Sequence, residues 1–203
     1  MAAPAAFGQV PNSPIAFVNR EAIAVSFVPV PSVGAPSGGG GPAADNPWLK
    51  VEFHYGTTDA VTKAYPYVDA IQFKVWIEGL DLFAPNPAFP GKGVAVALTG
   101  SVTYLNVGAG RDLYGAFYVH PSTLARFSSE RGYEDFDRKF NIHLEAYVGG
   151  IKVDYFDKTK ENDLNWYQPL RVVPGLVYRQ DQCPFLLVDP DRYPVIKPPE
   201  TAQ

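Results

Sequence analysis

The stretch from Phe140 to Phe156 constrains the fold most, because it has the pattern of a β-hairpin. Apolar residues alternate with polar or aromatic ones on both sides of Gly149-Gly150. Alternation at period two places one set of side chains on one face of a strand. A two-residue turn needs positive backbone φ angles, which glycine adopts without steric cost. The pattern therefore predicts two antiparallel strands joined by a tight turn.

The position of the turn also predicts the register of this hairpin. A two-residue turn pairs Val148 with Ile151 and, further along, Leu144 with Tyr155. Both apolar rows then fall on one face, so turn and pattern agree. We expect these four side chains in the core. The outer row then consists of His143, Glu145, Tyr147, Lys152, Asp154 and Phe156.

In this register, Glu145 and Asp154 lie directly opposite each other on the outer face. Like charges in that arrangement are destabilising. Either the flanking Lys152 screens them, or another segment or an ion neutralises them, and we favour Lys152.

The outer row also carries aromatic side chains, which favours a face that is partly covered. Tyr147 and Phe156 lie there, and Trp76 lies on the outer row of another predicted strand. A loop of the chain or a partner could provide the cover. We take Trp76, His143, Tyr147 and Phe156 as the candidate interaction surface.

The rest of the chain predicts about eight or nine strands and one short helix, at the spacing of an all-β sandwich or barrel. Pro29 and Pro31 indicate that the first strand lies at a sheet edge or ends near Val28, because proline cannot donate a ladder hydrogen bond. The helix is predicted over 121–131, with His120 or Ser122 near its cap. The predicted strands outside the hairpin lie within 21–31, 48–55, 68–78, 94–107 (bent at Gly100), 113–119, 166–170, 175–179 and 185–188, the last being the final strand.

The domain organisation follows from where proline and glycine gather. Residues 1–20 are expected to form a flexible arm, and 194–203 a proline-rich tail. Between them, 21–193 form a single β-sandwich domain that contains a flexible glycine-rich loop at 32–46. A chain of 203 residues can bury a sizeable core as one all-β domain.

Charge and composition exclude several classes of protein. The formal net charge is −4 and no cluster of Lys and Arg occurs, so no nucleic-acid partner is expected. No apolar run is long enough to span a bilayer. Cys183 is the only cysteine, which excludes an intrachain disulfide and fits a cytosolic protein or a secreted bacterial one.

The start of the chain lacks the basic and apolar regions of a signal peptide. Its small residues, followed by prolines, favour the hypothesis that a signal or anchor segment was removed and replaced by Met1. Such a segment would tether the natural protein to a membrane. The sequence places no constraint on the oligomeric state.

No constellation in the sequence indicates catalysis, a cofactor or a metal. His54 and His143 fall on outer rows, where solvent-facing strand residues are more common than zinc ligands. Cys183 precedes an apolar run and is expected to be an inert thiol. Neither a nucleophile elbow nor a phosphate-binding loop occurs. Asp189 to Arg192 is expected to be a turn with a local ion pair.

Several segments resemble an uncharacterised family from Verrucomicrobia such as Akkermansia, encoded next to type IV pilus assembly genes. They are Val51-Glu-Phe-His-Tyr55, Val75-Trp-Ile-Glu-Gly79, Val94 to Gly100, Asp112 to Thr123 and Pro184 to Tyr193. The resemblance covers roughly residues 48–193. It implies an immunoglobulin-like antiparallel β-sandwich similar to archaeal pilin domains, and it carries over no catalytic residue.

These observations lead us to expect a non-enzymatic, extracytoplasmic structural or interaction protein of the periplasm or cell surface. The resemblance implies an association with type IV pilus assembly and protein partners among pilus components. Contact would be made through sheet edges or the proline-rich loop 82–91. The alternative is a carbohydrate-binding module that uses exposed aromatics, namely Trp48, Trp76, Trp166 or the tyrosines.

Overall fold

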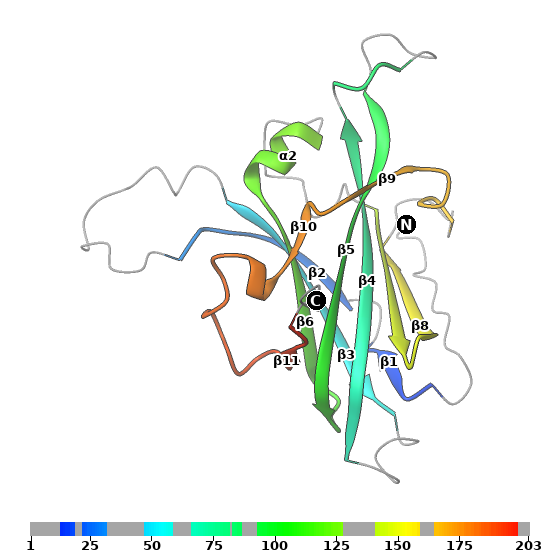
Figure 1. The fold of residues 1–203 in the computed structure, drawn as a ribbon, viewed down its shortest axis with the longest axis vertical. Helices are drawn as coiled ribbons and strands as arrows, with labels where there is room; N and C mark the ends of the chain where they lie inside the picture. Colours follow the sequence, from blue (N-terminus) through cyan, green and yellow to red (C-terminus); the bar gives the residue numbers. More distant parts are fainter. Residues whose placement is uncertain are drawn as a thin grey trace, which may run out of the picture.

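The computed structural model describes residues 13–18, 22–31, 47–58, 66–81, 83–86, 93–127, 141–158 and 165–198. Two β-sheets pack face to face and enclose the core (Figure 1). The predicted all-β sandwich with one short helix is confirmed. The predicted glycine-rich loop 32–46 lies outside the described residues, as does most of the proline-rich loop 82–91.

The smaller sheet has five strands in the order β1-β3-β6-β10, with β2 beside β1 on the same side of β3. The six-stranded sheet has the order β11-β5-β4-β7-β8, with β9 also paired to β5. All pairs are antiparallel except β5 with β9, which is parallel. The smaller sheet contains β1 (Ile15–Phe17), β2 (Ile23–Val28), β3 (Trp48–Thr57), β6 (Leu113–Val119) and β10 (Val177–Arg179). The larger sheet contains β4 (Tyr67–Asp81), β5 (Val94–Gly108), β7 (Ile142–Val148), β8 (Ile151–Lys158), β9 (Arg171–Pro174) and β11 (Val195–Ile196).

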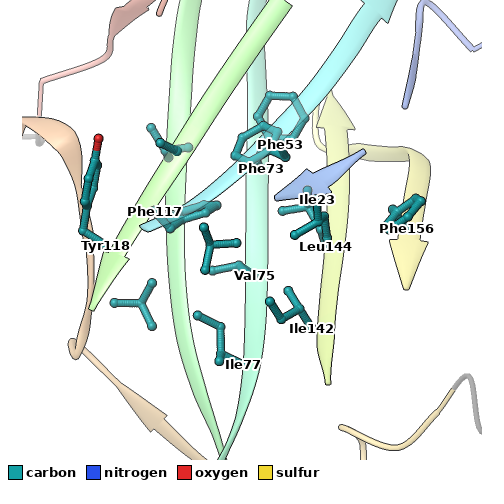
Figure 2. Close-up of a cluster of buried hydrophobic side chains, with 14 of the residues drawn as sticks. Ile23, Phe53, Phe73, Val75, Ile77, Phe117, Tyr118, Ile142, Leu144 and Phe156 are labelled. Atoms are coloured by element: carbon teal, nitrogen blue, oxygen red, sulfur yellow. The ribbon is translucent and has the colours of Figure 1, made fainter. Parts of the chain in front are cut away.

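The core forms where the inner rows of the two sheets meet (Figure 2). Phe53 of β3 and Phe73 of β4 bring their ring centroids to 4.6 Å across the interface. Gly115 of β6 makes room for this contact, since a Cβ there would lie 2.2 Å from the Phe53 ring. The alternation predicted for these strands is confirmed, because the inner residues of β3 and β4 are buried.

Short strands join the two sheets at both sides of the sandwich. On one side, the backbone N–H of Phe17 in β1 donates a 2.8 Å hydrogen bond to Asp154 of β8. On the other side, β10 packs against Gly100 of β5, where a Cβ would lie 2.9 Å from Val177. Gly100 therefore permits a close approach by another strand, whereas the sequence predicted a bend.

The terminal boundaries predicted from the sequence were wrong. Residues 15–17 were assigned to a flexible arm, but they form β1 in register with Tyr55–Thr57. Residues 194–203 were assigned to a tail, but Val195 and Ile196 form β11 against β5. Both strands are too short to produce a recognisable alternation, and each is held by a longer neighbour.

Two strand predictions near the C-terminus were also wrong. Residues 166–170 and 185–188 form turns, and the last strand is β11. After β10 the chain makes the short 3-10 helix η2 (Gln180–Gln182). Phe185 then stacks on Tyr118 of β6, with ring centroids 4.8 Å apart. The apolar run 185–188 therefore supplies one anchor to the outer face of the smaller sheet and is otherwise exposed.

The single α-helix among the described residues, α2 (Pro121–Phe127), begins where it was predicted. His120 Nδ1 accepts a 3.1 Å hydrogen bond from the backbone N–H of Ser122, so His120 serves as the cap. Leu124 and Phe127 are buried against the sandwich. The predicted end of the helix, 128–131, lies outside the described residues.

Candidate functional site

The hairpin that anchors the predicted interaction surface contains a β-bulge. Gly149 and Gly150 have φ angles of 58° and 79°, which confirms the predicted tight turn. Val148 pairs with Ile151 as expected, but the register shifts beyond Tyr147. From there Ala146 pairs with Asp154 and Leu144 with Phe156, leaving Val153 as the extra residue. The predicted pairing of Leu144 with Tyr155 was therefore wrong.

The bulge exchanges the faces of the second half of β8. Phe156 was predicted on the outer face but is 2% exposed, with its ring 6.2 Å from that of Phe17. Tyr155 was predicted in the core but faces outward near His143. Ile151, also predicted in the core, is 69% exposed at the tip of the hairpin.

Charge and burial together explain why the bulge forms. It moves Asp154 to the inner face, away from Glu145, and so removes the like-charge pair of the regular register. It also places Asp157 opposite His143, an attractive pair, and buries the larger Phe156 ring. Asp154 takes part in closing the sandwich by accepting the β1 hydrogen bond.

The outer face of the hairpin holds a compact cluster of ionisable groups around His143. His143 Nδ1 lies 2.7 Å from Asp157 Oδ1, and both side chains are nearly inaccessible to solvent. On its other side, His143 Nε2 lies 3.3 Å from Glu145 Oε1, an ion-pair contact longer than a good hydrogen bond. Glu145 also accepts hydrogen bonds from Lys152 Nζ at 2.9 Å and from the Tyr147 hydroxyl at 2.5 Å. The Glu145–Asp154 pair that Lys152 was expected to screen does not form, but Lys152 contacts Glu145 directly.

These contacts shift the pKa values in a consistent direction. Burial opposes ionisation of Glu145, but its bonds to His143, Tyr147 and Lys152 outweigh that effect and lower its pKa to about 2. Burial likewise opposes protonation of His143, yet Asp157 and Glu145 raise its pKa above the usual value. The cluster is thus arranged as two carboxylates balanced by two cations.

The chain itself covers much of this face. Tyr167, in the turn after β8, stacks on His143 with ring centroids 4.0 Å apart and contacts Trp76 at 5.2 Å. A hollow of about 300 Å³ remains beside it, lined by His143, Lys152, Tyr155, Asn165, Tyr167 and Gln168. A segment of the chain thus provides cover over His143 and part of Trp76.

Only three of the four residues of the predicted interaction surface lie on the outer face. Trp76 and His143 are neighbours on one face and Tyr147 lies on the same face four residues further along β7, whereas Phe156 belongs to the core. His143 is only 2% exposed, so it is a buried member of the cluster. Sequence reasoning missed Asp157 as its partner, because the unbulged register places Asp157 opposite Ile142 and not opposite His143. The sequence did contain one signal of a cluster around His143, namely Glu145, which is two residues away on the same strand face.

We expect a stability maximum in mildly acidic solution from this cluster. The lowered pKa of Glu145 contributes stability that is present above its usual pKa near 4.5 and is lost as the pH falls toward about 2. The raised pKa of His143 contributes stability that is present below about 6.5 and is lost as the pH rises through the folded-state value. Thermal unfolding from pH 2.5 to 9 measures both limbs.

The variant Glu145→Gln tests whether Glu145 causes the loss of stability at low pH. It removes the titrating carboxylate while keeping the size of the side chain. We expect its melting temperature to fall less steeply than that of the wild type between pH 4.5 and 2.5. Parallel curves for the two proteins would show that Glu145 does not carry the effect.

Little in the described residues supports chemistry or sugar binding. No group of three or more His, Cys, Asp and Glu there is placed to hold a metal ion. Burial raises the pKa of the Cys183 thiol to about 11, which disfavours the nucleophilic thiolate. Trp48 and Trp166 are 6% and 8% exposed, and Trp48 packs against Phe185. Buried indoles cannot act as stacking platforms, so the carbohydrate alternative loses two of its three tryptophans.

An exposed apolar patch lies on the opposite sheet, in the turns after η2. Leu186, Leu187 and Val188 are 52%, 81% and 38% exposed. Beside them is a groove of about 350 Å³, lined among others by Pro29, Tyr118, Phe185, Val188 and Tyr193. Contiguous apolar surface of this kind is typical of contact sites. In Figure 1 these turns (orange) lie on the side away from β8.

The residues between the patch and β11 tie this segment to the smaller sheet. Arg192 donates to Glu52 of β3 at 2.7 Å, and the Tyr193 hydroxyl donates to the same carboxylate at 2.6 Å. The local ion pair expected within Asp189–Arg192 was therefore wrong, because Arg192 reaches across to another strand. Its guanidinium also lies over the Tyr114 ring. The anchored segment holds the apolar patch in a defined position.

Comparison with known proteins yields a family and a fold. A protein-family model matches residues 15–200. The crystal structure of a protein from Akkermansia muciniphila superposes with a TM-score of 0.67 at 18% sequence identity, covering 97% of this chain and 93% of that one. At this identity the likeness concerns the fold alone. No curated protein matches the sequence. Among the described residues, no helix is both long and apolar enough to cross a membrane.

Proposed function

The chain belongs to the protein family whose model matches residues 15–200, and on that premise we propose that it is a non-enzymatic, extracytoplasmic interaction protein. Its role is structural, in type IV pilus assembly or another structure of the cell surface. Its partners are proteins, among them components of that structure. The family match and the likeness to an Akkermansia protein support the resemblance from which this role follows. The pilus association and the compartment rest on the resemblance.

The observation that carries a role in protein contact is the exposed patch Leu186–Val188. A leucine at 81% exposure between two further apolar residues is costly in water and gains free energy when a partner covers it. The segment is anchored on both sides. Phe185 stacks on Tyr118, and Arg192 donates a hydrogen bond to Glu52. A partner therefore meets a surface that needs little ordering on binding.

Fractionation of cells of the encoding organism tests the proposal. We expect the wild-type protein to sediment with the envelope, and Leu187→Asp to be released by weakening the contact roughly tenfold. Ile151→Asp is the matched control, since Ile151 is 69% exposed at the tip of the β7–β8 hairpin. This variant should sediment like the wild type. Recovery of the wild-type protein exclusively in the cytosol would contradict the proposal.

A further inference from the structure

A second groove, of about 530 Å³, crosses the outer face of the larger sheet where β4 and β5 run side by side. Lys74 and Trp76 from β4 and Thr99 and Ser101 from β5 line it, and the register pairs Lys74 with Ser101 and Trp76 with Thr99. The β9–β10 segment adds further lining, including Arg179. The volume is within the range of ligand-binding sites.

The charged residues among the described lining of this groove are Lys74 and Arg179. No Asp or Glu is among those described residues, in a chain whose formal net charge is −4. Arg179 is partly compensated, since it pairs with Asp181 at 2.8 Å and donates to the Lys197 carbonyl at 3.3 Å. The charge available to an occupant is therefore mainly that of Lys74.

Lys74 has a carboxylate opposite it in the sheet but makes no ion pair with it. The β4–β7 register places Lys74 across from Glu145. Glu145, however, is already engaged by Lys152, Tyr147 and His143. The Lys74 ammonium instead lies over the Tyr147 ring, 4.4 Å from its centroid. Within the described residues Lys74 thus makes no ion pair with a carboxylate.

Trp76 adds an aromatic surface next to this cation. It is half-buried, with contacts to Tyr167 at 5.2 Å and His143 at 5.3 Å that hold the indole in place. The part that remains accessible lines the groove. Adjacent positive charge and a fixed aromatic surface suit an extended segment that carries a carboxylate and an apolar side chain.

We propose that this groove binds an extended acidic segment of a partner protein, with a carboxylate on Lys74 and a neighbouring apolar side chain against Trp76. The site shares no lining residue with the groove beside the Leu186–Val188 patch and lies mainly on the larger sheet. This proposal depends on the proposed function only because it takes the bound molecule to be a protein.

A peptide titration of the full chain tests this. The probe is a blocked pentapeptide of alternating glutamate and valine, and its counterpart has glutamine for glutamate. We expect the acidic probe to shift the NMR signals of the Trp76 indole and of the Thr99 and Ser101 amides. Its affinity should fall with added salt, as expected for partly exposed charges. Lys74→Glu should weaken binding at least about tenfold, and Lys74→Arg should keep it within about twofold.

Arg111→Glu is the matched control, because Arg111 is exposed in the β5–β6 turn and its reversal changes the net charge equally. It should bind like the wild type. Equal binding of the glutamine peptide, or unchanged binding by Lys74→Glu, would overturn the inference. So would the absence of shifts at millimolar peptide. The titration uses the isolated protein in solution, whereas the fractionation uses cells. A negative result in one experiment therefore does not affect the proposal tested by the other.

Discussion

Replacing Phe156 with alanine is expected to lower the free energy of unfolding by about 3–5 kcal/mol, as for other buried phenylalanines. The side chain is 2% exposed and packs on Phe17, so its loss leaves a cavity between β8 and β1. The contact also helps to close that side of the sandwich. Urea unfolding followed by circular dichroism measures the change.

Ile151→Ala is the informative comparison for this prediction. Ile151 is 69% exposed, and its truncation should change stability by no more than about 0.5 kcal/mol. The regular, unbulged register places Phe156 in solvent, whereas Ile151 pairs with Val148 at the tip of the hairpin in both registers. A larger loss for Ile151→Ala than for Phe156→Ala would therefore contradict the bulge.

Removing the imidazole at position 143 is expected to have a comparably large effect. His143→Leu deprives the fully buried Asp157 carboxylate of its 2.7 Å partner. The second oxygen of Asp157 already has no hydrogen-bond partner among the described residues. Loss of one partner from a buried ion pair costs about 3–5 kcal/mol, because the remaining charge is left uncompensated. Urea unfolding at pH 6 measures this loss.

Two further variants show whether the loss of stability in His143→Leu comes from the unpaired charge of Asp157. His54→Leu removes a half-buried histidine that stacks on Tyr114, and should cost less than about 1 kcal/mol. The double variant His143→Leu/Asp157→Asn has no buried charge at position 157 and should recover part of the loss. If it is as unstable as the sum of the single variants, the charge is not the cause.

The general fold could be predicted because the signals that specify it are local. Alternation in β3, β4 and the hairpin, and the Gly149-Gly150 turn, depend only on neighbouring residues. The bulge in β8 depends on a comparison between two registers. It becomes favourable only once Phe17 of β1 is present to pack on Phe156, which is 139 residues away along the chain (156 − 17).

The outer-face cluster was only half predicted, for the same reason. Tyr147, Trp76 and Lys152 were placed on this face by alternation, and the contact of Lys152 with Glu145 was expected. The pairing of His143 with Asp157 and the stacking of Tyr167 were not, because one follows from the bulge and the other from a turn without periodicity.

The same reasoning explains the errors near the C-terminus. The run 185–188 has the composition of a buried strand, but its role is set by Trp48 and Tyr118, which offer an aromatic site on the outer face of the smaller sheet. Phe185 fills that site, and the residues after it are left in solvent. The run 186–188 is therefore exposed because Phe185 packs on residues distant in the sequence, and no local pattern predicts that packing.

Site-specific photo-cross-linking in living cells tests most directly whether this patch is a protein contact. A photoreactive amino acid is placed at Leu187 in one protein and at Ile151 in another, two apolar positions exposed on different parts of the molecule. Position 187 is predicted to yield a discrete cross-linked product with an envelope protein, and position 151 is predicted to yield none. Identical products at both positions, or none at position 187, would contradict the proposed role.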